Sequence, residues 1–140
     1  MSTPYPSQAN ESQPDSGSKD LALDGRQILL VEDCPDQGRL YLKFLQCAGA
    51  EVTLECTGQS AVDTVKKAPD LFDSIVMDFQ MPELDGLDAT RQLRELGYQG
   101  TIVGVTAFNS EDLRISWFQA GCNDLLDKPL ARSALIHAIL

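Results

Sequence analysis

Ligands for soft metals are scarce in this 140-residue sequence, which contains one histidine and four cysteines. Cys34, Cys47, Cys56 and Cys122 are widely separated and form no C-x-x-C pair. Because structural zinc sites use closely spaced cysteine and histidine ligands, we expect no such site. The cysteines are typical of reduced, mostly packed thiols, and they favour a cytoplasmic location.

Basic residues are also few, since 11 lysines and arginines stand against 21 acidic residues and give a formal net charge of -10. Proteins bind nucleic acids largely through contacts of Lys and Arg with phosphates, so no nucleic-acid partner is expected. The sequence has no apolar run of the about 20 residues that cross a bilayer. Its start also lacks the basic and apolar regions of a secretory signal. We therefore expect a domain that is not inserted in a membrane.

The first 25 residues differ in composition from the rest of the chain. They are dominated by Ser, Pro, Gln, Asn and Asp, and Leu21 is the first large aliphatic residue after Met1. Such a segment buries too little apolar surface to offset the entropy lost on ordering. The sequence thus predicts a disordered tail or interdomain linker over residues 1–25, followed by one folded domain over residues 26–140.

From residue 26 onward, short apolar runs alternate with segments of helical periodicity. The run 28–31 is continuously apolar, as expected for a strand that is buried on both faces of a parallel sheet. Asn109 is placed to cap the fourth of five predicted helices. The predicted strands are 28–31, 52–54, 75–77, 101–105 and 124–126, and the predicted helices are 35–48, 60–68, 87–96, 110–120 and 130–140.

Five strands, each followed by a helix, predict an α/β fold: a (βα)5 three-layer sandwich with a parallel sheet covered on both faces. Right-handed crossovers favour the flavodoxin-like strand order 2-1-3-4-5. Ligands of such sheets bind at the carboxyl ends of the strands, near the point where the strand order reverses. The chemistry of this chain is therefore expected at that edge.

Polar residues follow four of the predicted strands at that edge: Glu32 and Asp33, then Asp78, Thr106 and Lys128. Three carboxylates that are held close together repel one another unless one is protonated or a cation binds. An all-oxygen cluster suits Mg²⁺, which is usually held by one or two carboxylates together with phosphate oxygens. Asp78 could then act as a nucleophile and form an aspartyl-phosphate. The ammonium group of Lys128 and the hydroxyl of Thr106 could contact the phosphoryl oxygens.

The same segments resemble the receiver domains of two-component signalling. The resemblance covers residues 27 to 140, and its motifs follow one another in the family's order. They are Ile28-Leu29-Leu30-Val31-Glu32-Asp33, Met77-Asp78-Phe79-Gln80-Met81-Pro82 followed by Asp85-Gly86, Val105-Thr106-Ala107, and Asp127-Lys128-Pro129.

The resemblance implies that Asp78 is the phosphoacceptor. It further implies that Asp33 binds Mg²⁺ directly and that Glu32 binds it through water. The backbone carbonyl of Gln80 would be a further ligand. Thr106 and Lys128 would contact the phosphoryl group.

The resemblance also implies a conformational switch. In the family, phosphorylation draws the threonine inward and a neighbouring aromatic side chain follows, which remodels the face formed by the fourth helix, the fifth strand and the fifth helix. The aromatic position lies three residues before Lys128, and this chain has Leu125 there.

The favoured interpretation is a phosphorelay receiver that accepts a phosphoryl group from a phosphohistidine onto Asp78 with Mg²⁺ and switches a protein-interaction surface. Its phosphodonor would be a histidine kinase or a histidine phosphotransfer protein. The residues of the motifs are similar to those in the receivers of hybrid histidine kinases, which favours a receiver that is part of such a kinase. A freestanding regulator is the alternative. Dimerisation on activation is left open. We expect no stand-alone enzyme, but a domain that catalyses its own phosphorylation and dephosphorylation.

Three other functions fit the sequence less well. A Mg²⁺-dependent aspartate-nucleophile phosphohydrolase of the haloacid-dehalogenase type carries a second Asp two residues after the first, where this chain has Gln80. A degenerate receiver that acts only as a binding module typically lacks the acceptor Asp or the Lys, whereas Asp78 and Lys128 are both present. A flavodoxin-like cofactor binder needs a phosphate-cradling loop after the first strand, where Glu32 and Asp33 would repel a phosphate.

Overall fold

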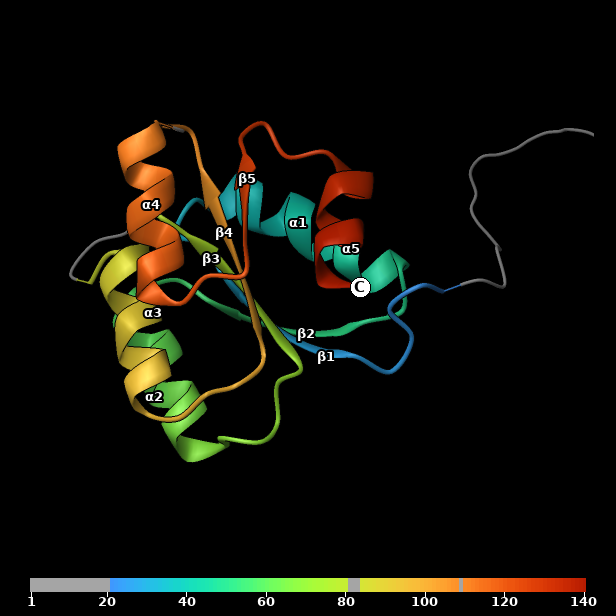
Figure 1. Ribbon diagram of the computed structural model, residues 1–140. Coiled ribbons are helices and arrows are strands. Elements are labelled where there is room, and N and C mark those ends of the chain that lie inside the picture. The colour runs from blue at the N-terminus through green and yellow to red at the C-terminus, as the bar shows by residue number, and fades with distance from the viewer. Residues whose placement is uncertain (1–20, 81–83, 109) are drawn as a thin grey trace, which may run out of the picture.

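The computed structural model describes residues 21–80, 84–108 and 110–140. In this part of the chain five strands and five helices alternate (Figure 1). They are β1 (Gln27–Val31), α1 (Pro35–Cys47), β2 (Glu51–Glu55), α2 (Gly58–Lys67), β3 (Ser74–Asp78), α3 (Gly86–Glu95), β4 (Thr101–Thr106), α4 (Glu111–Ala120), β5 (Asp124–Asp127) and α5 (Arg132–Ile139).

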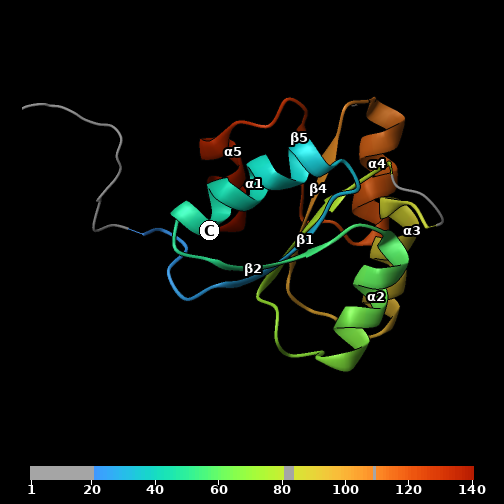
Figure 2. The same ribbon diagram turned by 180° about the vertical axis from the view of Figure 1, so that it is seen from behind.

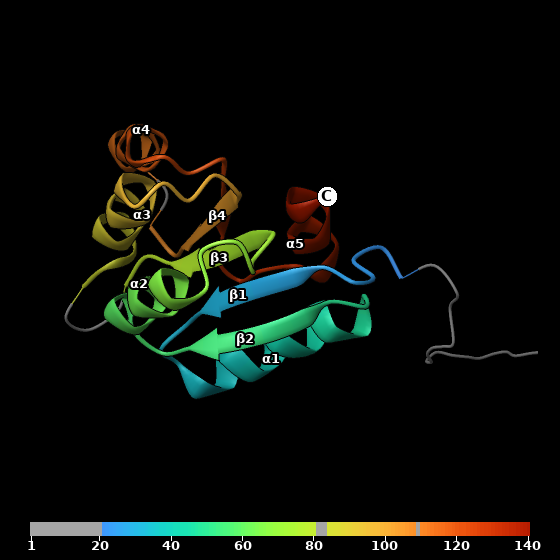
Figure 3. The same cartoon turned by 90° about the horizontal axis from the view of Figure 1, so that it is seen from below.

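The strands form one parallel sheet in the order β2-β1-β3-β4-β5, which confirms the predicted topology. Figure 3 shows β2, β1, β3 and β4 side by side in this order. Helices α1 and α5 cover one face of the sheet, and α2, α3 and α4 cover the other (Figures 1 and 2). The predicted three-layer sandwich is therefore confirmed.

The core consists of two apolar clusters, one on each face of the sheet. Successive residues of β1 point alternately into them: Leu29 and Val31 belong to the cluster under α2, α3 and α4, whereas Ile28 and Leu30 belong to the cluster under α1 and α5. A strand that helices cover on both faces is buried at both alternating sets of positions and is therefore largely apolar. This explains the continuous apolar run of β1, and also why every residue of β3 is buried.

Helix boundaries differ from the predicted ones where a side chain caps a helix. Helix α2 begins two residues earlier than predicted, because the hydroxyl of Thr57 accepts a hydrogen bond from Ser60 N at 3.0 Å. Asp85 caps α3 in the same way through Asp88 N, at 2.9 Å. Helix α4 is capped by Ser110, whose hydroxyl accepts from Leu113 N at 3.1 Å. The predicted cap Asn109 lies outside the described residues.

The last helix was predicted to begin at Leu130, and this prediction is wrong. Helix α5 begins at Arg132, because Ala131 has an extended backbone and precedes the first turn. Leu130 is buried before the helix begins, and it packs in the cluster that contains Leu135 and Ile139. The apolar character of Leu130 therefore reflects core packing and not helical periodicity.

Residues 21–25, which the sequence assigned to a tail, form a turn against the end of α1. Leu23 is fully buried, and its N–H donates to Ala48 O at 2.8 Å. Residues 21–25 therefore pack with the folded domain. The tail or linker predicted for the residues before them stays a prediction, because residues 1–20 lie outside the described part of the chain. Among the residues that the structure describes, no helix is both long enough and apolar enough to cross a membrane.

A close packing contact joins β4 to α4. Gly104 faces the ring of Trp117, and a Cβ atom added at Gly104 would lie 2.9 Å from two carbon atoms of that ring. The same added atom would lie 3.1 Å from Leu125, a buried residue of β5. Trp117 is itself fully buried, and its ring lies 5.9 Å from that of Phe79, the residue after β3. The absence of a side chain at Gly104 therefore makes room for the indole.

Candidate functional site

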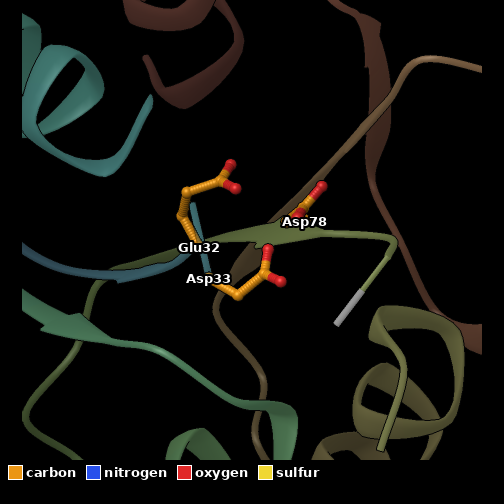
Figure 4. Close-up of side chains that lie close together, drawn as sticks. All are labelled: Glu32, Asp33 and Asp78. Atoms are coloured by element: carbon orange, nitrogen blue, oxygen red, sulfur yellow. The ribbon is translucent and has the colours of Figure 1, made fainter. Parts of the chain in front are cut away.

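Three carboxylates gather at the carboxyl ends of β1 and β3. Each of Glu32, Asp33 and Asp78 offers a carboxylate oxygen, and these oxygens all lie within 4.8 Å of one another. Glu32 and Asp33 follow β1, and Asp78 is the last residue of the neighbouring strand β3 (Figure 4). Glu32 and Asp78 are each 3% exposed, whereas Asp33 is exposed to solvent. The cluster is thus open on the side of Asp33.

Burial and nearby negative charge disfavour ionisation of the two buried acids, Glu32 and Asp78. Burial, and then the neighbouring Asp78 carboxylate, raise the pKa of Glu32 from 4.5 to about 7. Burial also raises the pKa of Asp78, although the hydrogen bond from Lys128 opposes this effect. A cation bound among the oxygens would offset the repulsion, and an all-oxygen set of carboxylates fits the ligand preference of Mg²⁺.

Lys128 supplies a positive charge inside the cluster. Its Nζ atom lies 2.9 Å from Asp78 Oδ1 and 3.5 Å from Glu32 Oε1. It also donates a hydrogen bond to Gln37 Oε1, at 2.8 Å. Burial alone would lower the pKa of Lys128, but the hydrogen bond to Asp78 and the negative charges of Asp78 and Glu32 together outweigh this effect, and the pKa is raised. The lysine is therefore held as a cation against the oxygens of Asp78.

Thr106 lies at the same end of the sheet but is bonded within its own loop. It is the last residue of β4 and 1% exposed. Its hydroxyl oxygen accepts the N–H of Phe108 at 3.0 Å and lies 3.4 Å from the carbonyl oxygen of that residue. The side chain of Phe108 is 58% exposed. The buried hydroxyl is thus connected to an exposed aromatic residue.

The start of α3 packs closely against the backbone of Asp78 and Phe79. Gly86 N donates to Phe79 O at 2.8 Å, and a Cβ atom added at Gly86 would lie 2.1 Å from Asp78 O. Only glycine leaves room for this approach. Gln80 is exposed to solvent, and its predicted role as a carbonyl ligand stays a prediction. Met81 and Pro82 of the motif lie outside the described residues.

The structure therefore brings Glu32, Asp33, Asp78 and Lys128 together and places Thr106 at the same edge of the sheet. The family model that describes the response regulator receiver domain matches residues 28–140. The chain belongs to the response regulator receiver domain family.

Curated relatives of this receiver domain include both short regulators and large kinases. The domain is 34% identical over 113 residues to the two-component response regulator ARR22 of Arabidopsis thaliana, and the match covers 80% of each chain. It is 37% identical over 114 residues to the osmosensing histidine protein kinase SLN1 of Saccharomyces cerevisiae. That match covers 78% of this chain and 9% of the kinase.

A solved structure is similar in both sequence and fold. The receiver domain of the sensor histidine kinase PA1611 from Pseudomonas aeruginosa is 36% identical, with a TM-score of 0.75 over 82% of this chain and 94% of that one. It carries a magnesium ion coordinated in its active-site cleft. The fold is further shared with the receiver domain of a Francisella response regulator, at 23% identity and a TM-score of 0.76 over 82% of this chain and 93% of that one.

Two features of the receiver were not anticipated from the sequence. Gln37, in the first turn of α1, contacts Lys128 although 91 residues separate them. Fully buried Trp117 and partly buried Phe79 form an aromatic pair beside the site. Leu125, at the position that is often aromatic in the family, is 5% exposed and packs in the same apolar cluster as Trp117.

Proposed function

We propose that this receiver accepts a phosphoryl group from a phosphohistidine onto Asp78, with Mg²⁺, and in response changes a protein-interaction surface. The phosphodonor would be a histidine kinase or a histidine phosphotransfer protein. One observation carries the proposal: the Asp78 carboxylate lies beside two further carboxylates and is contacted by the Lys128 ammonium group at 2.9 Å.

In the proposed reaction a carboxylate oxygen of Asp78 attacks the phosphorus atom of the phosphohistidine. The new P–O bond forms as the P–N bond breaks, and the electron pair of that bond stays on the imidazole nitrogen. Mg²⁺, held by Glu32, Asp33, Asp78 and the Gln80 carbonyl, would supply positive charge next to the phosphoryl oxygens. Lys128 turns from the Asp78 carboxylate to a phosphoryl oxygen and stabilises its negative charge.

The loop after β4 supports the proposed change of surface. Thr106 can donate its hydroxyl to the newly bound phosphoryl group only by leaving its contact with Phe108 O. Because the N–H of Phe108 is bonded to the same hydroxyl, a movement of Thr106 moves the backbone that carries this exposed aromatic residue. Ile115 and Phe118 on the following helix α4 are exposed as well, at 47% and 41%. The surface that responds would include these three side chains.

We propose that the domain is the receiver of a hybrid histidine kinase. One of its relatives is a histidine kinase, and the match covers 9% of that protein. A freestanding cytoplasmic regulator is the alternative, favoured by the match with ARR22 over 80% of each chain. A phosphohydrolase is disfavoured, because Gln80 stands where that chemistry needs an acid–base carboxylate.

Intact-mass spectrometry tests the proposal. The protein is incubated with Mg²⁺ and acetyl phosphate, and we expect one base-labile phosphoryl adduct. Asp78→Asn should give none, whereas Asp70→Asn, at an exposed aspartate beyond α2, should label like the wild type. Labelling of Asp78→Asn at the wild-type rate would disprove the assignment of the acceptor. Absence of an adduct on the wild type, in the presence of demonstrated Mg²⁺ binding, would favour the binding-only alternative.

A further inference from the structure

The ammonium group of Lys128 has a partner that is not a carboxylate. Gln37 Oε1 accepts a hydrogen bond from Lys128 Nζ at 2.8 Å, which is as short as the contact of Lys128 with Asp78 at 2.9 Å. Gln37 belongs to the first turn of α1, on the opposite side of the sheet from α2, α3 and α4. It lies outside the metal cluster formed by the three acids.

The start of α1 explains why the Gln37 side chain is available for this contact. A Gln three residues after a helix cap commonly turns back and accepts the N–H of the cap residue. Here the N–H of the cap residue, Cys34, donates to Glu32 Oε2 at 3.3 Å, and the Cys34 side chain makes no cap hydrogen bond. The amide of Gln37 is therefore directed to Lys128. The first turn of α1 contacts the site twice, through the Cys34 backbone and through the Gln37 side chain.

A neutral acceptor at this position has a distinct chemical effect. Lysine is a long, flexible side chain, and ordering it costs conformational entropy. The contact with Gln37 fixes the position of the ammonium group but leaves its charge uncancelled. A carboxylate in the same place would form an ion pair with the lysine and weaken its attraction for an incoming phosphoryl group.

The two contacts also differ in what phosphorylation does to them. Once Asp78 carries a phosphoryl group, its carboxylate charge is replaced by that of the phosphoryl oxygens, so the ion pair with Lys128 must be exchanged. Gln37 takes no part in this exchange, and its hydrogen bond can persist throughout. It can therefore hold the ammonium group near the reacting oxygen before and after the transfer.

We propose that Gln37 is a positioning residue for phosphoryl transfer, which holds the Lys128 ammonium group against Asp78 through its side-chain carbonyl. This role rests on the proposed function of Asp78 as the phosphoacceptor.

The test compares three variants in the full chain. Gln37→Met keeps the length of the side chain and removes the acceptor oxygen, whereas Gln37→Glu keeps an acceptor and adds a negative charge. Gln46→Met is the matched control, since Gln46 is an exposed glutamine near the other end of the same helix. The maximal rate of phosphorylation is measured by mass spectrometry with phosphoramidate, a small donor with a P–N bond. In parallel, nitrogen-15 NMR of Lys128 Nζ reports whether its protons are protected from exchange with water.

For Gln37→Met we expect a fall of about tenfold in the maximal rate, which is typical for loss of one hydrogen bond to a charged group. The Lys128 Nζ signal should also lose its protection. Gln37→Glu should keep the protected signal and still react more slowly, because the ammonium charge is then cancelled. Gln46→Met should match the wild type in both measurements. In the background of Lys128→Ala, Gln37→Met should cause no further loss, because the two residues act through one contact.

The results that would disprove the role of Gln37 differ from the result that would disprove the proposed function. If the wild type labels on Asp78 and Gln37→Met labels at the same rate, the role of Gln37 is disproved and the proposed function stands. An equal loss of rate from Gln37→Met with and without Lys128 would also disprove it, because Gln37 would then act independently of the lysine. If the wild type does not label at all, the proposed function fails, and with it the role of Gln37, even if the Nζ signal shows the contact.

Discussion

The charge of Glu32 should make the receiver less stable as the pH rises. Its folded-state pKa is about 7, above the ordinary value of 4.5, mainly because the side chain is buried. A group whose pKa is raised on folding contributes stability below its ordinary pKa, and this contribution is lost as the pH rises through the folded pKa. The contribution of Glu32 to the free energy of unfolding is therefore lost between pH 4.5 and about 7.

The size of the effect follows from these two values. At about 1.4 kcal/mol for each pH unit, the difference between 4.5 and about 7 corresponds to about 3 kcal/mol. Glu32→Gln removes the charge and keeps an oxygen that can accept the N–H of Cys34, which now donates to Glu32 Oε2. We expect the variant to be about 3 kcal/mol more stable than the wild type at about pH 8, and about 1 kcal/mol more stable at about pH 5.5.

Urea unfolding without Mg²⁺, followed by circular dichroism at both pH values, measures this difference. Glu95→Gln, at an exposed residue that ends α3, is the control and should change the free energy of unfolding little at either pH. Added Mg²⁺ should reduce the advantage of Glu32→Gln, since the cation offsets the repulsion in the wild type. A variant that is less stable than the wild type at about pH 8, or a gain that is the same at both pH values, would refute the electrostatic reasoning.

Three further predictions concern the metal, the core and the aromatic pair. Mg²⁺ should raise the thermal midpoint of the wild type at about pH 8 and raise that of Asp33→Asn less, as differential scanning calorimetry can check; equal shifts would exclude Asp33 as a ligand. Gly104→Ala should cost about 1–3 kcal/mol in urea unfolding, because the new methyl group would lie 2.9 Å from the Trp117 ring; an unchanged midpoint would show that the ring moves freely. Phosphorylation should change the fluorescence of Trp117, the single tryptophan, because its ring contacts Phe79 next to Asp78; identical spectra before and after labelling would contradict this coupling.

The strands and the acidic cluster could be predicted because each depends on a simple pattern. A sheet covered on both faces requires continuous apolar runs, and the run 28–31 and the fully buried β3 follow this requirement. The carboxyl ends of parallel strands share one edge, so residues at the carboxyl ends of β1, β3 and β5 are expected to meet there. Asp33, Asp78 and Lys128 were therefore predictable as neighbours without knowledge of any side-chain conformation.

Other features depend on packing that the sequence pattern does not express. The start of α2 is set by the hydrogen bond of the Thr57 hydroxyl, which adds two residues that have no apolar periodicity. Leu130 was assigned to a helix because it is apolar, whereas tertiary packing buries it before the helix begins. The contact of Gln37 with Lys128 depends on which way an amide side chain turns, and the sequence alone does not determine that.

The fit of Trp117 against Gly104 has a consequence for receivers that are recombined in the laboratory. In a chimaera that joins this β4 to an α4 with a smaller side chain in place of Trp117, that side chain would leave a void over Gly104. In the reverse chimaera, any side chain at the position of Gly104 would overlap the Trp117 ring. A crossover between β4 and α4 is therefore a poor place to join two parents, and the segment from Thr101 to Ala120 is better exchanged as one block.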